Sequence, residues 1–305
     1  MTESPDEFAS LIEVAAELGR GPDAAIPRAA RQVVEVDENQ QLSVIGWGET
    51  APELVFLHGG GQNAHTWDLV ALELDRPAIA IDLPGHGHSS WRDDRDYSPV
   101  RNAVAVATVI EQLAPHAAGV VGMSLGGATT IRLAATRPDL VRRAVLVDVT
   151  PGSARAATRM TREQRGATAL IGGPRTFASL SEMTELAVRA SPRRPASAVR
   201  RGVLHNARQL PDGTWTWRYD LFGTQAVTAQ PQFESLWDDL AALSMPTLLV
   251  KGGDSAFVTA EDQAEAIRRL PTIRIVVVPG AGHAVQSDQP IALADLIRDF
   301  LEIGQ

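Results

Sequence analysis

Six short apolar runs recur along this chain, and stretches with helical periodicity lie between most of them. The runs cover residues 54–57, 78–81, 119–121, 144–147, 247–250 and 274–278. The helical stretches cover residues 99–113, 125–135, 259–270 and 290–301. Buried strands that alternate with helices are typical of βαβ units. We therefore predict an α/β fold with a mostly parallel central sheet flanked by helices.

The alternation is interrupted once, between residues 151 and 243, where most patterns are helical and turns are frequent. We interpret this segment as a mainly helical cap domain inserted between two strands of a core formed by residues 1–150 and 244–305. Residues 1–30 are expected to be a leading helical segment. Residues 31–36 and 41–47 are β-rich and flank a polar turn, which predicts a hairpin.

The sequence Gly122-Met123-Ser124-Leu125-Gly126 ends one predicted strand and begins the next predicted helix. It matches the motif G-x-S-x-G, in which a serine occupies a sharp turn between a strand and a helix. Glycines on either side allow the two elements to pack closely, and the serine hydroxyl is lifted clear of the sheet. This context makes Ser124 a candidate nucleophile.

Two further segments extend the pattern: Leu57-His58-Gly59-Gly60-Gly61, and the turn at residues 82–89 that reads DLPGHGHS. Together with the Ser124 motif they resemble the α/β-hydrolase fold superfamily, from about Arg31 to the C-terminus. The texture is most similar to its serine esterase, lactonase and haloperoxidase-like group. The resemblance implies the α/β-hydrolase fold with an inserted cap, and an oxyanion hole formed by the N–H groups of Gly60 and Leu125, with Gly61 the less favoured donor.

The segment Gly280-Ala281-Gly282-His283 resembles the family's G-x-G-H and follows the last predicted strand. The family order of nucleophile, acid and histidine then makes His283 the general base. Two aspartates satisfy the same order. We favour Asp254, which follows the strand at 247–250 as the family acid usually does, although the G-x-x-D pattern places Ser255 there and Asp254 one residue early. Asp148, at the end of the strand at 144–147, is the alternative, since some relatives carry their acid there.

The resemblance implies hydrolysis of a carboxylic ester or lactone through an acyl-enzyme at Ser124. Trp215 and Trp217, in the cap, are candidates for the wall of an apolar substrate pocket. Two activities on the same residues are alternatives: carbon–carbon bond hydrolysis of the meta-cleavage-product type, and perhydrolase or haloperoxidase-like chemistry. The first is disfavoured because Met123 and Ala284 stand where those enzymes usually have Asn and Trp. A ligand-binding module without catalysis is the alternative from another class.

The composition of the chain argues against several classes of binding partner. Its net charge is −9 over 305 residues and it has no long basic run, which argues against nucleic acid. Cysteine is absent, and the histidine pair His86 and His88 lacks further ligands close in sequence, so we expect no metal and no cofactor. The acidic first residues do not resemble a signal peptide, and no apolar stretch is long enough for a membrane span. We expect a cytoplasmic enzyme that acts on a small-molecule substrate and does not bind membranes. A homodimer is possible.

Overall fold

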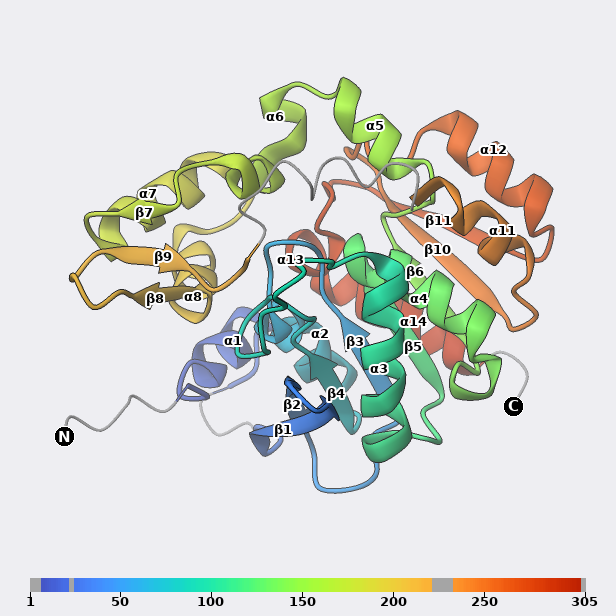
Figure 1. Cartoon of the computed structure of the whole chain (residues 1–305), viewed down its shortest axis with the longest axis horizontal. Coiled ribbons are helices and arrows are strands. Elements are labelled where there is room, and N and C mark those ends of the chain that lie inside the picture. The colour runs from blue at the N-terminus through green and yellow to red at the C-terminus, as the bar shows by residue number, and fades with distance from the viewer. Residues whose placement is uncertain (1–6, 22–24, 221–232, 303–305) are drawn as a thin grey trace.

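The computed structural model describes residues 7–21, 25–220 and 233–302 of the chain (Figure 1). Its central sheet has eight strands in the order β1-β2-β4-β3-β5-β6-β10-β11. The strands are β1 Ala29–Asp37, β2 Gln40–Trp47, β3 Leu54–Leu57, β4 Ala78–Ile81, β5 Gly119–Met123, β6 Ala144–Val147, β10 Thr247–Gly252 and β11 Arg274–Val278. All neighbours from β4 to β11 pair in parallel, and the β1–β2 hairpin adds the antiparallel edge. The predicted α/β fold with a mostly parallel sheet is confirmed.

Helices cover both faces of this sheet (Figure 1). One face packs against α3 Pro99–Leu113, α4 Leu125–Thr136, α11 Leu236–Ala241 and α12 Ala260–Arg269. The other face packs against α1 Leu11–Glu17, α2 Asp68–Leu74 and α14 Pro290–Glu302. Short helices η1 Ala64–Trp67, η2 Pro138–Leu140 and α13 Val285–Asp288 lie in the connections. Since both faces are covered, the central strands β3, β4 and β6 are buried at every residue, which explains their continuous apolar sequences.

The segment between β6 and β10 contains a second, smaller cluster of apolar side chains that includes Phe177, Met183, Val199 and Trp217. Its elements are α5 Ser153–Arg159, α6 Arg162–Arg165, η3 Gly166–Gly172, β7 Thr176–Phe177, α7 Leu180–Ala190, α8 Ala196–Asn206, β8 Ala207–Gln209 and β9 Trp215–Trp217. In Figure 1 most of these elements lie to one side of the carboxyl ends of the parallel strands. We use the name cap for residues 160–220 of this segment.

The structure corrects two details of the predicted cap. The three-stranded antiparallel sheet β7-β9-β8 was not expected, because strands of two or three residues are too short to show an alternating pattern. The prediction also ended the cap at residue 243. Helix α11 instead packs on α4, and its Leu236 and Leu240 are buried in the cluster of the central sheet. Residues 233–243 therefore belong to the core.

The leading segment forms one short helix, α1, which packs on α2 through Leu11, Val14 and Ala15. Its other side faces the cap, where Glu17 accepts two hydrogen bonds of 2.8 Å from Arg201 of α8. The helix therefore contacts both the core and the cap.

Candidate active site

Ser124 lies at the turn from β5 to α4 with φ +51° and ψ −114°, a backbone conformation that few residues other than glycine adopt. The flanking glycines are required by packing. A Cβ atom on Gly122 would overlap the carbonyl of Gly126, and one on Gly126 would overlap the carbonyl of Leu57 in β3. The turn is therefore held between two strands and a helix, which keeps the strained serine in one orientation.

His283 follows β11 and contacts Ser124 and Asp148 through its two ring nitrogens. Its Nε2 atom lies 3.0 Å from Ser124 Oγ, and its Nδ1 atom lies 2.7 Å from Asp148 Oδ2. An ionised carboxylate can only accept, so Nδ1 carries the proton and Nε2 is free to accept the proton of the serine hydroxyl. The ring of Phe257 stacks on the imidazole at a centroid distance of 3.6 Å and fixes its plane. No motif in the sequence indicated this role of Phe257.

The preference for Asp254 as the partner of His283 was wrong, and the structure places Asp148 there. Asp148 is fully buried at the end of β6 and also accepts a 3.0 Å hydrogen bond from the N–H of Gly252 and a hydrogen bond from the hydroxyl of Ser255. Asp254 is half-exposed, and its Oδ2 atom lies 3.6 Å from Nε of Arg193 in the cap.

Asp148 can take the place expected for Asp254 because β6 pairs with β10. The two strands are parallel neighbours, and Val147, the last residue of β6, pairs with Val250, two residues before the end of β10. The residues that follow the two strands therefore lie at the same edge of the sheet. A carboxylate at the end of either strand can reach His283. In this chain the β10 loop supplies Ser255, a donor to the carboxylate, instead of the carboxylate itself.

The glycine loop after β3 has three N–H groups, and hydrogen bonds occupy two of them. Gly59 donates to the side chain of Gln62 over 3.1 Å, and Gly61 donates to Nε2 of His86 over 3.1 Å. Within the described residues the N–H of Gly60 has no protein acceptor. Leu125 is the first residue of α4, where helix geometry leaves the N–H without an intrahelical partner. These are the two donors that the sequence predicted for an oxyanion hole.

A cavity of about 1080 Å³ lies between the core and the cap and reaches His283 and Gly60. Trp217 and Tyr219 of the cap are among its lining residues, and their rings stack at 5.9 Å. Trp215 packs against the cap's own apolar cluster and is not among the lining residues. The two tryptophans predicted from the sequence therefore differ: Trp217 faces the cavity, and Trp215 does not.

Comparison with known proteins places this architecture. The model of the alpha/beta hydrolase family matches residues 54–296. The chain belongs to the alpha/beta hydrolase family. The esterase Rv0045c of Mycobacterium tuberculosis is 50% identical over 97% of this chain and 96% of that protein. A solved structure of that esterase, described together with its transition metal inhibition, matches with a TM-score of 0.84 and 49% identity, over 97% of this chain and 99% of the other.

A second relative is more distant. The 2-(acetamidomethylene)succinate hydrolase of Mesorhizobium japonicum is 29% identical over 83% of this chain and 89% of that protein. A crystal structure of an E-2-(acetamidomethylene)succinate hydrolase matches with a TM-score of 0.75 and 27% identity, over 90% of this chain and all of the other. The match with the esterase spans 97% of this chain and therefore includes both the core and the cap.

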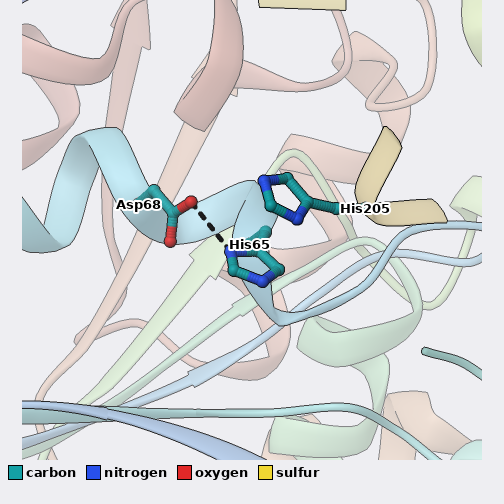
Figure 2. Close-up of side chains that lie close together, drawn as sticks. All are labelled: His65, Asp68 and His205. Atoms are coloured by element: carbon teal, nitrogen blue, oxygen red, sulfur yellow. Dashed lines mark hydrogen bonds and ion pairs between the residues drawn. The ribbon is translucent and has the colours of Figure 1, made fainter. Parts of the chain in front are cut away.

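Histidines of this alpha/beta hydrolase also lie outside its Ser124–His283–Asp148 chain. At the junction of core and cap, Nδ1 of His65 lies 3.0 Å from Asp68 Oδ2, and the ring of His205 stacks on that of His65 at 3.7 Å (Figure 2). One ligand atom from each of the three residues lies within 4.8 Å of the others. In the described chain this is the group of side chains that could hold a metal ion. The sequence did not indicate it, because His205 is far from the other two residues along the chain.

Two buried histidines support the loops of the hydrolase. His58 accepts a 2.9 Å hydrogen bond from the N–H of Leu83, and His86 accepts the one from Gly61. Burial lowers the pKa of both side chains, that of His86 to about 3, so both are neutral acceptors at neutral pH. His86 is therefore a support of the glycine loop rather than the metal ligand considered from its spacing to His88.

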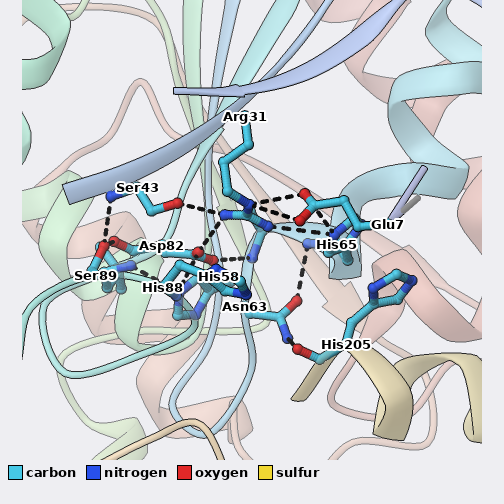
Figure 3. A network of polar contacts seen from close by, with 12 residues as sticks. Glu7, Arg31, Ser43, His58, Asn63, His65, Asp82, His88, Ser89 and His205 are labelled. Carbon is cyan, nitrogen blue, oxygen red and sulfur yellow. Dashed lines mark hydrogen bonds and ion pairs between the residues drawn. The ribbon is translucent and has the colours of Figure 1, made fainter. Parts of the chain in front are cut away.

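Asp82 and Arg31 tie the same loops to the N-terminal segment (Figure 3). Asp82 accepts hydrogen bonds from the N–H groups of Ala64 and His88, at 2.7 and 3.0 Å, and pairs with Arg31 at 2.8 Å. Burial acts to raise the pKa of Asp82, but the charge of Arg31 and the two N–H donors outweigh it and lower the pKa. Arg31 also binds the carboxylate of Glu7. The network keeps the turn at residues 82–89 in contact with the loop that carries Gly60.

No helix in the described ranges is long and apolar enough to cross a lipid bilayer.

Proposed function

We propose that this protein hydrolyses carboxylic esters or lactones through an acyl-enzyme formed on Ser124. The observation that carries the proposal is the hydrogen-bonded chain from Ser124 through His283 to Asp148, at 3.0 and 2.7 Å. Such a chain activates a serine for attack on a carbonyl carbon. The 50% identical relative is named an esterase, which supports an ester as the substrate.

The steps follow from the positions of these groups. Ser124 Oγ attacks the carbonyl carbon while His283 Nε2 takes its proton, and Asp148 stabilises the imidazolium through Nδ1–H. The N–H groups of Gly60 and Leu125 stabilise the negative oxygen of the tetrahedral intermediate. His283 then gives its proton to the alkoxide of the leaving group. The alcohol is released, and the acyl group stays bound to Ser124 as the acyl-enzyme. A water molecule, deprotonated by the same imidazole, releases the acid and restores the serine.

The cavity supports a small, largely apolar substrate. Its cap side carries Leu170, Ile171 and Trp217, and its volume of about 1080 Å³ is ample for a drug-sized ligand. Trp217 replaces the pair of tryptophans that the sequence suggested as the aromatic wall.

Labelling with a fluorophosphonate probe and turnover of short aryl esters test the proposal together. Wild-type protein should be labelled and active. Ser124→Ala should show no labelling and should lose turnover by at least on the order of 10⁴-fold, since the oxyanion donors alone give only residual catalysis. A folded wild type that is not labelled would indicate a ligand-binding module. Ser124→Ala with more than about a tenth of wild-type turnover would exclude this nucleophile.

A cytoplasmic location, a small-molecule substrate, the absence of nucleic-acid and membrane partners, and a homodimer stay predictions from the sequence. Fractionation of the native cells tests the location. Analytical ultracentrifugation of the purified chain tests the homodimer, which should sediment at twice the mass of the chain.

A further inference from the structure

The cavity between core and cap carries more positive than negative charge, although the chain as a whole has a net charge of −9. The arginines that line it are Arg162, Arg165, Arg189, Arg193, Arg194 and Arg201. The carboxylates that line it are Asp68, Glu163, Asp254 and Asp288. An excess of positive charge in a cavity attracts anions, so the arginines without a partner indicate what this cavity can bind.

Three of these arginines already form ion pairs with carboxylates of the chain. The pairs are Arg194 with Asp288 at 2.7 Å, Arg201 with Glu17 at 2.8 Å and Arg189 with Glu185 at 3.9 Å. Asp68 is paired with a histidine of the core at 3.0 Å, so it does not neutralise an arginine. The positive charge that a ligand could meet therefore comes from the remaining arginines.

Arg165, the last residue of α6, has no partner for its charge. Its guanidinium forms no ion pair within the described ranges of the chain, and its buried Nε atom has no hydrogen-bond partner there. Glu163 of the same helix is exposed and lies two positions away, a spacing at which side chains of a helix do not face each other. A buried donor without an acceptor is destabilising, and a bound anion removes that cost.

Arg193 lies in the turn between α7 and α8 and reaches the proposed general base. Its Nη1 atom lies 2.9 Å from the position that a Cβ atom on Gly282 would take, so the guanidinium packs against the residue before His283. Its Nε atom is 3.6 Å from Asp254, too far for a hydrogen bond, and both side chains are half-exposed. In the part of the chain that the structure describes, the guanidinium forms no hydrogen bond. Its donors are therefore available to a ligand that reaches Ser124.

We propose that the substrate is an ester with one carboxylate on an otherwise apolar frame, and that Arg165 and Arg193 bind this carboxylate. Guanidinium groups bind carboxylates through parallel, charge-assisted hydrogen bonds. Leu170 and Trp217 line the same cavity and contact the apolar part of the substrate. A carboxylate held by the cap presents the ester group to Ser124 of the core. The inference rests on the proposed reaction at Ser124 and names the class of its substrate.

Pairs of esters that differ only in charge test the proposal. One pair is the 4-nitrophenyl monoester of adipic acid and its monoamide, and the other is 4-carboxyphenyl butyrate and 4-carbamoylphenyl butyrate, with the charge on the leaving group. We expect wild type to have the higher kcat/KM for the charged member of at least one pair. The double variant Arg165→Gln, Arg193→Gln should lower the charged-to-neutral ratio of kcat/KM for that pair by at least about tenfold. Arg200→Gln, an exposed arginine of α8 that does not line the cavity, is the matched control and should keep the wild-type ratio.

Inhibition of the wild type gives a second measurement that does not depend on the folding of a variant. Adipate should inhibit hydrolysis of 4-nitrophenyl butyrate at least about tenfold more strongly than its monoamide, because only adipate has a second carboxylate for the arginines. Preference of wild type for the neutral member of both pairs, a smaller fall in the ratio for the folded double variant, or equal inhibition by the two acids would overturn the proposal. Hydrolysis of the neutral esters would then still support the reaction at Ser124. A wild type that hydrolyses no ester would instead contradict the proposed function, and this inference with it.

Discussion

At the scale of single residues, His283, the proposed general base, is positioned by contacts with its neighbours. Asp148 holds Nδ1, Phe257 stacks on one face of the ring, and Ser255 and Gly252 donate to the carboxylate. Three hydrogen bonds therefore fix the orientation of this fully buried carboxylate. We therefore expect the proposed proton transfer from Ser124 to His283 to depend on Asp148 and not on Asp254.

Substitution of each candidate acid by asparagine tests which aspartate supports His283. Asp148→Asn should lower turnover of an aryl ester by on the order of 10⁴-fold, because an amide favours the wrong tautomer of the imidazole. Asp254→Asn is the matched control and should stay within several-fold of wild type, since its contact is with half-exposed Arg193. Steady-state kinetics on folded variants gives both values, and the reverse order of the two losses would return the role to Asp254.

The burial of His86 should make part of the free energy of unfolding sensitive to acid. Burial lowers its pKa from 6.5 to about 3, so the folded protein keeps it neutral where the unfolded chain binds a proton. Its contribution is complete above about pH 6.5 and is lost as the pH falls towards 3, at up to about 1.4 kcal/mol per pH unit. His86→Gln retains an acceptor for Gly61 and should remove this part of the slope. Urea unfolding between about pH 7 and 5 measures it.

The surface variant His116→Gln is the control for that measurement, since His116 is exposed. It should keep the wild-type dependence of the unfolding free energy on pH. An unchanged slope in His86→Gln would show that other groups account for the acid sensitivity.

At the scale of elements, the strand–turn–helix at Ser124 depends on how closely α4 approaches β3 and β5. The glycines at 122 and 126 are needed because backbone carbonyls occupy the space of their Cβ atoms. This close packing explains why the glycines of the G-x-S-x-G motif are the clearest pattern in the sequence. Strands β3, β4, β6 and β11 and helix α3 have the predicted bounds, because each is a complete apolar run or a capped amphipathic stretch.

Alanine substitutions at two helical glycines test the role of this approach. Gly126→Ala forces the helix away from the Leu57 carbonyl and should lower the unfolding free energy by about 1–3 kcal/mol. Gly202→Ala, in the exposed face of α8 with nothing near the new methyl group, should raise it by about 0.4–1 kcal/mol. Denaturant unfolding gives both changes. A Gly126→Ala protein as stable as wild type would mean that α4 is free to shift.

At the scale of the whole molecule, α1 joins the two parts of the hydrolase. It packs on α2 of the core, while Glu17 forms a two-bond pair with Arg201 of the cap and Ser10 contacts His205. The cap also contacts the glycine loop through Asn206. The position of the cap is thus set by residues that lie far apart along the chain.

Removal of the Glu17–Arg201 pair should loosen the cap. Arg201 is largely buried, so Glu17→Gln leaves its charge without a full partner and should cost about 1–3 kcal/mol. We expect faster proteolysis within residues 160–220 and a change in tryptophan fluorescence from Trp217. Arg200→Gln, an exposed neighbour on the same helix, is the control and should be cleaved at the wild-type rate. Equal cleavage of Glu17→Gln and wild type would show that α1 does not hold the cap.

The sequence by itself determined the α/β fold, the insertion between two strands, and Ser124, His283 and the Gly60 loop as candidates. These features are local: each depends on the periodicity of one segment or on glycines within a few residues of each other. The turn at Ser124 follows from that local pattern, whereas the order of the strands in the sheet depends on the packing of the whole core.

Tertiary structure alone decided which aspartate meets His283, that Phe257 and Ser255 support it, that α11 belongs to the core, and that His205 stacks on His65. Each of these depends on the distance between segments that are far apart in the chain. Asp148 and Asp254 follow neighbouring parallel strands, and the structure pairs Asp148 with His283 and Asp254 with Arg193. A pattern along the sequence has no information at that scale, because the distances are set only when the sheet and the cap have packed.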